Sequence, residues 1–210
     1  MCNHYDSVQE SHRLSTYFGV DSDIVIPSTS MWPRQPGVFI RAGHDLAVGR
    51  WGLIPPQTSA AYLPKAERLP TFNARSETIE QRFSFRHACS HHQRCIVPAE
   101  AIYEPDWRSG HAVSTRIWRT DGAPMGIAGI WDRYQDLSGQ WQLSFTLLTV
   151  NADQHPLFRQ YHAPGKEKRM VVILQNDDYE HWLSGSSALA DLLDYPDAEL
   201  SSAPAAVMPQ

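Results

Sequence analysis

The chain begins Met1-Cys2, and this position gives Cys2 a chemistry that no internal cysteine has. If Met1 is removed, Cys2 carries a free α-amine and a thiol on adjacent carbons. The amine can condense with an aldehyde to a Schiff base, and the thiol can then close a five-membered thiazolidine. An α-amine has a pKa of about 7.7–8.0, so part of it is unprotonated at pH 7. The alternative is that Cys2 is simply the second residue of a disordered terminus.

A second candidate segment reads Thr-Phe-Asn-Ala-Arg-Ser-Glu-Thr at residues 71–78. It places Asn73 and Arg75 two positions apart, just before an expected helix start. An Asn side chain both donates and accepts hydrogen bonds, and the planar guanidinium of Arg suits a phosphate. The alternative is that Asn73 is a turn residue and Arg75 a surface charge.

A third segment, residues 94–105, ends an expected strand with the carboxylate of Glu104. Because Glu104 follows Ile102 and Tyr103, we expect it to be partly desolvated, which raises a carboxyl pKa toward values useful for proton transfer. The alternatives are that Glu104 faces solvent at the strand end, or that Glu100 is the functional carboxylate.

A fourth segment, residues 161–170, places His162 in a loop ahead of the basic residues Lys166, Lys168 and Arg169. A histidine there could shuttle protons close to a phosphate. The chain has 10 histidines, so a structural or solvent-exposed role is the alternative for any one of them.

Short apolar runs predict the strands that would position these segments. Residues 142–146 alternate polar and apolar side chains, as a half-buried strand does, and lead into the apolar residues 147–150. The polar stretch around Gly139 predicts a hairpin loop. The other expected strands are residues 38–41, 46–48, 95–97, 126–131 and 170–174.

Helical signals are fewer. Residues 76–92 lack Gly and Pro, and Ser76 could cap the start of a helix there; residues 179–183 follow two acidic residues that suit a helix N-terminus. Residues 186–193 predict another short helix, and residues 196–210, rich in Pro, Ala and Ser, predict a loose tail. Helices do not alternate with strands, so we predict a strand-rich α+β domain at residues 1–193 and a flexible acidic tail at 194–210.

The composition bounds the class of protein. A length of 210 residues with 42% hydrophobic residues fits one domain with a sizeable core. The three cysteines (Cys2, Cys89 and Cys95) are odd in number and form no CxxC pair, which argues against a disulfide framework and a zinc site. No segment approaches 18 apolar residues, and the polar N-terminus is not a secretory signal. We therefore expect a cytoplasmic protein that needs no metal, no organic cofactor and no membrane.

The charge is distributed unevenly. The net charge is −5, yet residues 34–94 hold nine Lys or Arg and four Asp or Glu. Residues 176–210 hold seven acidic residues and no Lys or Arg. This asymmetry allows a basic, nucleic-acid-binding face on an acidic protein, although scattered surface charges are the simpler alternative.

Taken in order, these segments resemble the SRAP (SOS-response-associated peptidase) family of abasic-site processing proteins. The matching stretches are Met1-Cys2, Trp-Gly-Leu-Ile-Pro at residues 51–55, Phe-Asn-Ala-Arg-Ser-Glu-Thr at 72–78, Arg-Cys-Ile-Val-Pro-Ala at 94–99, Tyr103-Glu104, His162 and Arg169-Met170. The resemblance implies a mainly antiparallel, barrel-like sheet with peripheral helices.

The resemblance also implies a function. Family members bind single-stranded DNA at an abasic site and cross-link the ring-opened sugar aldehyde to the mature N-terminal cysteine as a thiazolidine. Carried over by motif, Cys2 would be the nucleophile and would serve in autoproteolytic removal of Met1. Asn73 would bond the linkage, and Glu104 would move protons during ring closure and reversal. His162 would assist Schiff-base formation and sugar ring opening, and Arg75 would hold a phosphate. Associated activities would be those of a peptidase and a DNA lyase.

Further DNA contacts are expected from Arg86 and Arg169, and from base stacking on Trp51, Trp107 and Tyr103, with core packing as the alternative role of each tryptophan. We expect a monomer that associates with the nucleoid when bound to DNA.

The chain also departs from the family pattern. Asn3-His4 replaces the usual Gly-Arg, so an arginine–phosphate contact is lost or replaced by a weaker one. Pro105 replaces an aromatic residue, and residues 56–59 replace a tryptophan-rich stretch. The compact His-x-Arg-Met-Pro motif is expanded, because six residues separate His162 from Arg169. His155 is the alternative if the loop aligns differently.

Two other functions remain open at the level of sequence. One is an N-terminal-nucleophile thiol hydrolase or peptidase, in which His162 activates Cys2. The other is a DNA-binding module that has lost cross-linking, which Asn3 and His4 would explain.

Overall fold

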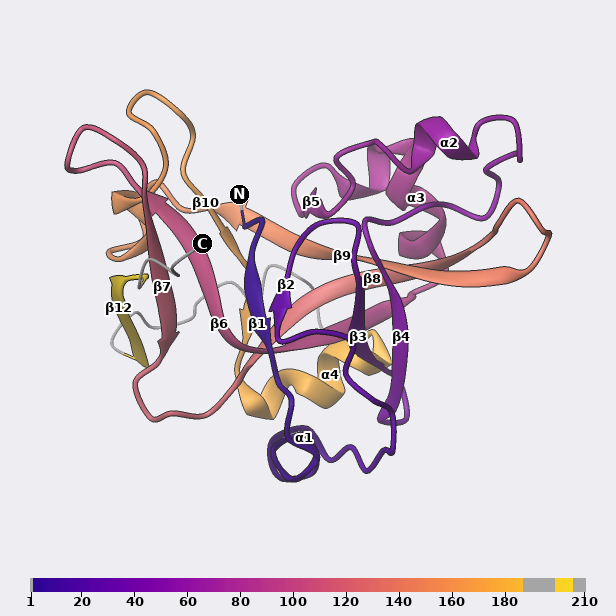
Figure 1. Cartoon of the computed structure of the whole chain (residues 1–210), viewed down its shortest axis with the longest axis horizontal. Coiled ribbons are helices and arrows are strands. Elements are labelled where there is room, and N and C mark those ends of the chain that lie inside the picture. Colours follow the sequence, from indigo (N-terminus) through magenta and orange to yellow (C-terminus); the bar gives the residue numbers. More distant parts are fainter. Residues whose placement is uncertain (1, 187–198, 206–210) are drawn as a thin grey trace.

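The computed structural model describes residues 2–186 and 199–205 (Figure 1). Within these ranges, five strands close into a barrel in the order β8-β9-β4-β3-β6, with β6 pairing back onto β8. The β4–β9 pair is parallel and the other four pairs are antiparallel. The predicted strand-rich α+β fold with a mainly antiparallel, barrel-like sheet is therefore confirmed. The barrel strands are β3 (Pro36–Arg41), β4 (Asp45–Trp51), β6 (Arg94–Asp106), β8 (Met125–Gln135) and β9 (Trp141–Asn151).

Shorter strands extend this barrel at its edges. β1 and β7 pair with β6, β2 pairs with β1, β5 and β10 pair with β9, β11 pairs with β8, and β12 pairs with β7. Their bounds are β1 Tyr5–Ser7, β2 Ser30–Met31, β5 Asn73–Arg75, β7 Val113–Arg119, β10 Arg169–Val171, β11 Ile173–Leu174 and β12 Leu200–Pro204.

The helices are short and peripheral. In Figure 1, α2 and α3 lie together on one flank, close to β5, while α4 and α1 lie on the opposite side of the barrel strands. None of the helices in the described residues is long and apolar enough to cross a membrane. The helices are α1 (Ser11–Phe18), α2 (Leu63–Ala66), α3 (Phe83–Ser90) and α4 (Tyr179–Ser184), with 3-10 turns η1 (Ile79–Gln81), η2 (Phe158–Gln160) and η3 (Asn176–Asp178).

Three expectations about these elements need correction. The helix expected at 76–92 is broken, because the Ser76 N–H still pairs with Thr149 of β9 and Arg82 is extended (φ −88°, ψ 126°). The run at 170–174 forms two strands with different partners, since β10 joins β9 and β11 joins β8. Within the expected loose tail, Leu200–Pro204 pairs with β7 and covers that edge. Residues 187–198 and 206–210, including most of the helix expected at 186–193, lie outside the described residues.

The barrel strands approach one another closely at Gly129 of β8, which lies between β6 and β9. It pairs with Leu147 of β9 and Cys95 of β6. A Cβ atom at this position would lie 2.6 Å from the Thr146 carbonyl oxygen and 3.0 Å from the Cys95 Sγ. The backbone of β9 cannot move away without disturbing its pairing, so no side chain fits here.

Substitution of Gly129 by alanine tests this close approach. We expect Gly129→Ala to lower the free energy of unfolding by about 1–3 kcal/mol, as overpacking of a core does. Chemical denaturation measures this change. The control is Gln140→Ala in the exposed β8–β9 loop, which should stay within about 0.5 kcal/mol of wild type. Equal stability of the two variants would contradict this close packing at Gly129.

Candidate active site at the N-terminal cysteine

The pairing of β1 with β6 brings the start of the chain to Glu104. Tyr5 pairs with Ile102, and the Tyr103 N–H donates to the His4 carbonyl, 3.0 Å away. Continued toward the N-terminus, this antiparallel register leads Cys2 along the part of β6 that carries Glu104. Two residues remote in sequence thus meet through a strand pairing rather than through a loop.

Cys2 is buried, with 1% of its surface exposed. Burial raises the pKa of its thiol to about 12, and the nearby Glu104 carboxylate adds to the shift. The Sγ atom lies 3.4 Å from the His4 carbonyl oxygen, to which it donates. The thiol is therefore protonated at neutral pH, and it needs a base before it can act as a nucleophile.

Asn73 of β5 holds the backbone of Cys2 through a hydrogen bond. β5 runs parallel to β9, with Asn73 opposite Leu147, and this fixes the start of β5 beside the N-terminal segment. The Asn73 Nδ2 donates to the Cys2 carbonyl oxygen over 2.6 Å. Among the described residues its buried Oδ1 atom has no hydrogen-bond partner, so it can still accept a bond from a donor at the cysteine.

Glu104 and His162 form a buried pair near Cys2. The His162 Nε2 lies 3.5 Å from the Glu104 Oε2, and the two side chains are 9% and 0% exposed. Burial raises the pKa of Glu104 to about 7 and lowers that of His162. A carboxyl group with a pKa near 7 exchanges protons readily at neutral pH, as an acid–base catalyst must.

The backbone around His162 is held in an unusual conformation. Its φ angle is +64°, in the left-handed region that costs a residue with a side chain about 1–2 kcal/mol. The His162 N–H donates to the Pro105 carbonyl (2.9 Å), which ties this residue to the end of β6 beside Glu104. The His162 Nε2 also lies 2.9 Å from the Arg169 carbonyl oxygen. A carbonyl only accepts, so this nitrogen carries the hydrogen of the neutral ring.

Arg169 is an internal support of the site and is buried. It is 3% exposed and donates to both oxygens of Glu77 (2.8 Å each), to Glu167 (2.9 Å) and to the Thr149 carbonyl (2.8 Å). The expectation that Arg169 contacts DNA is therefore wrong. Its position opposite Asn151 on β9 explains why, because β9 runs between β5 and β10 and buries the side chain.

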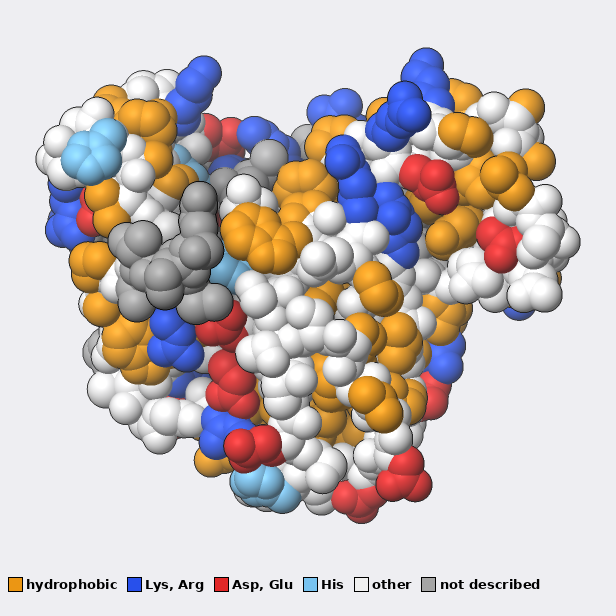
Figure 2. All heavy atoms as spheres, viewed as in Figure 1, with side chains coloured by type: hydrophobic (Ala, Val, Ile, Leu, Met, Phe, Trp, Pro, Cys, Tyr) orange, Lys and Arg blue, Asp and Glu red, His pale blue; other side chains and the backbone are white. Residues whose placement is uncertain are grey.

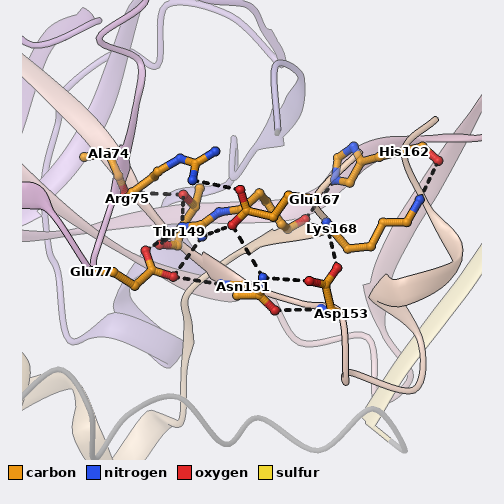
Figure 3. Close-up of polar contacts among 10 residues, drawn as sticks. Ala74, Arg75, Glu77, Thr149, Asn151, Asp153, His162, Glu167 and Lys168 are labelled. Atoms are coloured by element: carbon orange, nitrogen blue, oxygen red, sulfur yellow. Dashed lines mark hydrogen bonds and ion pairs between the residues drawn. The ribbon is translucent and has the colours of Figure 1, made fainter. Parts of the chain in front are cut away.

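Arg75 is exposed, but its guanidinium is already paired. The Arg75 Nη1 lies 2.7 Å from the Glu167 Oε2, and the two side chains are 48% and 35% exposed (Figure 3). Residues 73 and 75 of β5 share one face of the strand, so Arg75 lies on the same side as Asn73. The loop between His162 and Arg169 supplies the competing carboxylate, and nothing in the sequence pattern indicated this contact.

The other expected site residues take different places. Trp51 is fully buried and donates its Nε1–H to the Phe72 carbonyl (2.8 Å), so the prediction that it stacks on DNA is wrong and its core-packing alternative holds. Trp107 is half-buried, just after β6, and Arg86 is exposed on α3. Figure 2 shows Lys and Arg side chains gathered over the α2–α3 region. The exposed basic residues there are Lys65, Arg68, Arg82 and Arg86.

Glu100 and His155, the alternatives to Glu104 and His162, have structural roles elsewhere. Glu100 accepts two hydrogen bonds of 2.8 Å from Arg13 on α1 and anchors that helix. The His155 Nδ1 accepts the Leu157 N–H (3.2 Å) and the Phe158 N–H (3.3 Å), which shapes its own turn. His162 is the histidine that meets Glu104. In the described part of the chain, no group of three or more His, Cys, Asp or Glu is placed to hold a metal ion.

An aromatic stack beside the site could not be foreseen from sequence. The His4 ring lies between Trp32 and Tyr103, with ring centroids 4.2 Å and 3.9 Å apart. The three residues come from the N-terminal segment, the loop after β2 and strand β6. Tyr103 was among the residues expected to stack on DNA, whereas nothing in the sequence indicated Trp32.

Comparison with known proteins places this arrangement in a family. A family model described as SOS response associated peptidase (SRAP) matches residues 1–207. A crystal structure of a protein from Bordetella bronchiseptica is 48% identical, with a TM-score of 0.94 over 98% of this chain and 100% of that one. Another, from Bacteroides thetaiotaomicron, shares the fold at 23% identity, with a TM-score of 0.82 over 98% of this chain and 93% of the other.

A phage-related protein from Bordetella bronchiseptica also shares the fold, at 17% identity and a TM-score of 0.63 over 97% of this chain and 93% of that one. The search of curated proteins gives no match. Because the family model spans nearly the whole sequence, this chain belongs to the SOS response associated peptidase (SRAP) family.

Proposed function

We propose that this protein binds single-stranded DNA and forms a covalent thiazolidine cross-link with abasic sites through Cys2, after Met1 has been removed. The observation that carries the proposal is the meeting of Cys2, Asn73 and the Glu104–His162 pair in one buried site. An abasic sugar equilibrates with an open-chain aldehyde, which is the electrophile that an aminothiol takes up. A missing base also requires no flipping, and a single strand requires no unpairing.

The reaction follows from the chemistry of these groups. Hydrolysis of the Met1–Cys2 peptide bond frees the α-amine, in keeping with the family's peptidase name. The amine adds to the aldehyde carbon, and loss of one water gives a Schiff base. The Sγ atom then bonds the same carbon while its proton passes to a base and the imine nitrogen gains a proton. The thiazolidine that results contains all atoms of the aminothiol and the aldehyde except that water.

Each neighbour of Cys2 has a role in these steps. Glu104 takes the thiol proton, because its pKa of about 7 leaves it ionised in a substantial fraction of molecules at neutral pH. The Asn73 Nδ2 holds the Cys2 carbonyl, and its Oδ1 can accept a bond from the amine. The neutral His162 ring donates its Nε2–H to the Arg169 carbonyl, so Nδ1 is the atom that can take a proton from the sugar hydroxyl and return it to the ring oxygen during ring opening.

A cross-linking assay tests the proposal. We expect the wild-type protein to give an SDS- and heat-resistant conjugate with single-stranded DNA that carries an abasic site, and Cys2→Ala to give none. Cys89→Ser is the matched control, because this half-buried thiol on α3 is outside the site, and it should give as much conjugate as wild type. Conjugate from Cys2→Ala, or turnover of a peptide substrate with no DNA adduct, would overturn the proposal.

The pH dependence of the reaction tests the role of Glu104. Gln mimics the protonated carboxyl, so the ratio of the wild-type rate to the Glu104→Gln rate should rise with pH, with a midpoint near 7. Above pH 8 we expect a ratio of about 100, typical of general base catalysis. The pH dependence that comes from the Cys2 α-amine is the same in both proteins, so it drops out of the ratio of their rates. Single-turnover gel assays measure it, and a ratio that stays flat from pH 5.5 to 8.5 would exclude Glu104 as the base.

The contact between Arg75 and Glu167 predicts a variant that binds DNA more tightly. A phosphate must compete with the Glu167 carboxylate for Arg75, so Glu167→Gln should lower the Kd for single-stranded DNA about tenfold at low salt. Fluorescence anisotropy with an unreactive abasic analogue measures this. Glu80→Gln, which removes an exposed charge elsewhere, controls for net charge. The gain should vanish in Arg75→Ala, and a gain that survives there would contradict the masking of Arg75.

A further inference from the structure

Trp32, His4 and Tyr103 form a preassembled stack. Their planes are nearly parallel, with interplanar angles of 10° between His4 and Trp32 and 12° between His4 and Tyr103. Trp32 forms the outer layer and is 45% exposed, so a large aromatic surface remains open at the end of the stack. The exposed indole offers a flat apolar surface on which a further ring can stack.

Polar contacts hold the stack in place. The His4 Nε2 lies 2.7 Å from the Ser30 Oγ, and the Tyr103 hydroxyl donates to the Asp6 Oδ2 over 2.9 Å. Burial lowers the pKa of His4, so at neutral pH the ring is uncharged. His4 thus acts as an aromatic layer and not as a cationic ligand for phosphate. A rigid stack also loses little side-chain entropy when another ring joins it.

A groove of about 660 Å³ opens beside the stack, within the size range of ligand sites. Its other walls include the apolar residues Val113, Trp118 and Pro204 and the cation Arg116. The Arg116 guanidinium lies 5.0 Å from the centre of the Trp118 ring. None of the described residues that line the groove is acidic, but the Arg116 Nε lies 3.5 Å from the Asp6 Oδ2. Apolar faces and a cation thus combine here as a nucleotide requires, with Asp6 as the competing partner of Arg116.

The groove begins next to the reactive residue. The Cys2 Sγ donates to the His4 carbonyl, and two residues of chain span at most about 7 Å. A nucleotide attached to Cys2 through its sugar would therefore have a neighbour within reach of the stack.

We propose that the Trp32–His4–Tyr103 stack binds the unpaired nucleobase of a nucleotide that flanks the lesion. The base stacks on the open face of Trp32, and its phosphate lies toward Arg116. This inference rests on the proposed function, since it assigns a subsite for the same DNA strand. It replaces the phosphate contact expected at position 4 with stacking, which is insensitive to base identity.

The test uses Trp32→Ala, with Trp141→Ala as the matched control. Trp141 is similarly exposed (51%) at the start of β9 and belongs to no stack with His4. Stacking is worth about 1–3 kcal/mol per base, so Trp32→Ala should raise the Kd for abasic single-stranded DNA roughly 5- to 150-fold. Trp141→Ala should leave it unchanged, and Trp32→Phe should recover most of the affinity.

The DNA provides a second arm. When the base on the 5′ or the 3′ side of the lesion is replaced by a baseless spacer, wild type and Trp32→Ala should bind one of these two oligonucleotides equally. If Trp32 is merely structural, wild type and Trp32→Ala should differ in affinity by the same factor on every oligonucleotide. If the groove binds an apolar peptide instead, the two proteins should not differ on any oligonucleotide. Either result would overturn the inference. Failure of the wild type to cross-link abasic DNA would count against the proposed function, whatever Trp32→Ala does.

Discussion

The antiparallel pairing of β1 with β6 is the constraint on which the site depends. It buries Cys2 and sets this residue close to Glu104. Since chain ends are usually poorly ordered, a reactive terminal cysteine needs such an anchor. The three-residue strand is held by ladder hydrogen bonds and by Tyr5, which is fully buried and lies edge-on to Trp51. Trp51 therefore supports the site indirectly, because it packs against Tyr5 of β1.

Burial sets the chemistry of the site as well as its geometry. The Cys2 thiol and the Glu104 carboxyl lie close together in a place from which water is excluded, and this raises the pKa of each. Two negative charges cannot be accommodated there cheaply, so a single proton that moves between the two groups keeps the pair at one negative charge throughout. The strained backbone of His162 keeps its imidazole at the same carboxylate. The ionic contacts of Arg169 lie one layer further out and hold the segment that follows His162.

Much of the fold and of the candidate site could be predicted from the sequence. Alternation and β-branched runs gave the barrel strands because one or both faces of each are buried. The residues brought together at Cys2 lie in local motifs whose side-chain types suit one reaction. The broken helix at 76–92 was missed because tertiary pairing of Ser76 with β9 overrides local propensity. Arg169 and Trp51 were misplaced because an Arg or a Trp near a site looks the same in sequence whether it faces the core or solvent.

Contacts between distant segments were the least predictable. The Glu167 carboxylate reaches Arg75 only because β9 aligns β5 with β10, and His4 meets Trp32 only through the pairing of β1 with β2 and β6. No local pattern encodes such registers. Both features coincide with departures from the family pattern, namely the expanded loop after His162 and the replacement of Gly-Arg by Asn3-His4. Under the proposed function they would change how a DNA strand is held, while the buried site around Cys2 is intact.

Tandem mass spectrometry of the N-terminal peptide, after reaction with abasic single-stranded DNA and digestion, tests the central claim most directly. We expect a peptide that starts at Cys2 and carries the sugar remnant, with no primary α-amine and no free thiol left at Cys2. A remnant on a lysine such as Lys166 or Lys168, or a conjugated peptide that still begins with Met1, would contradict it.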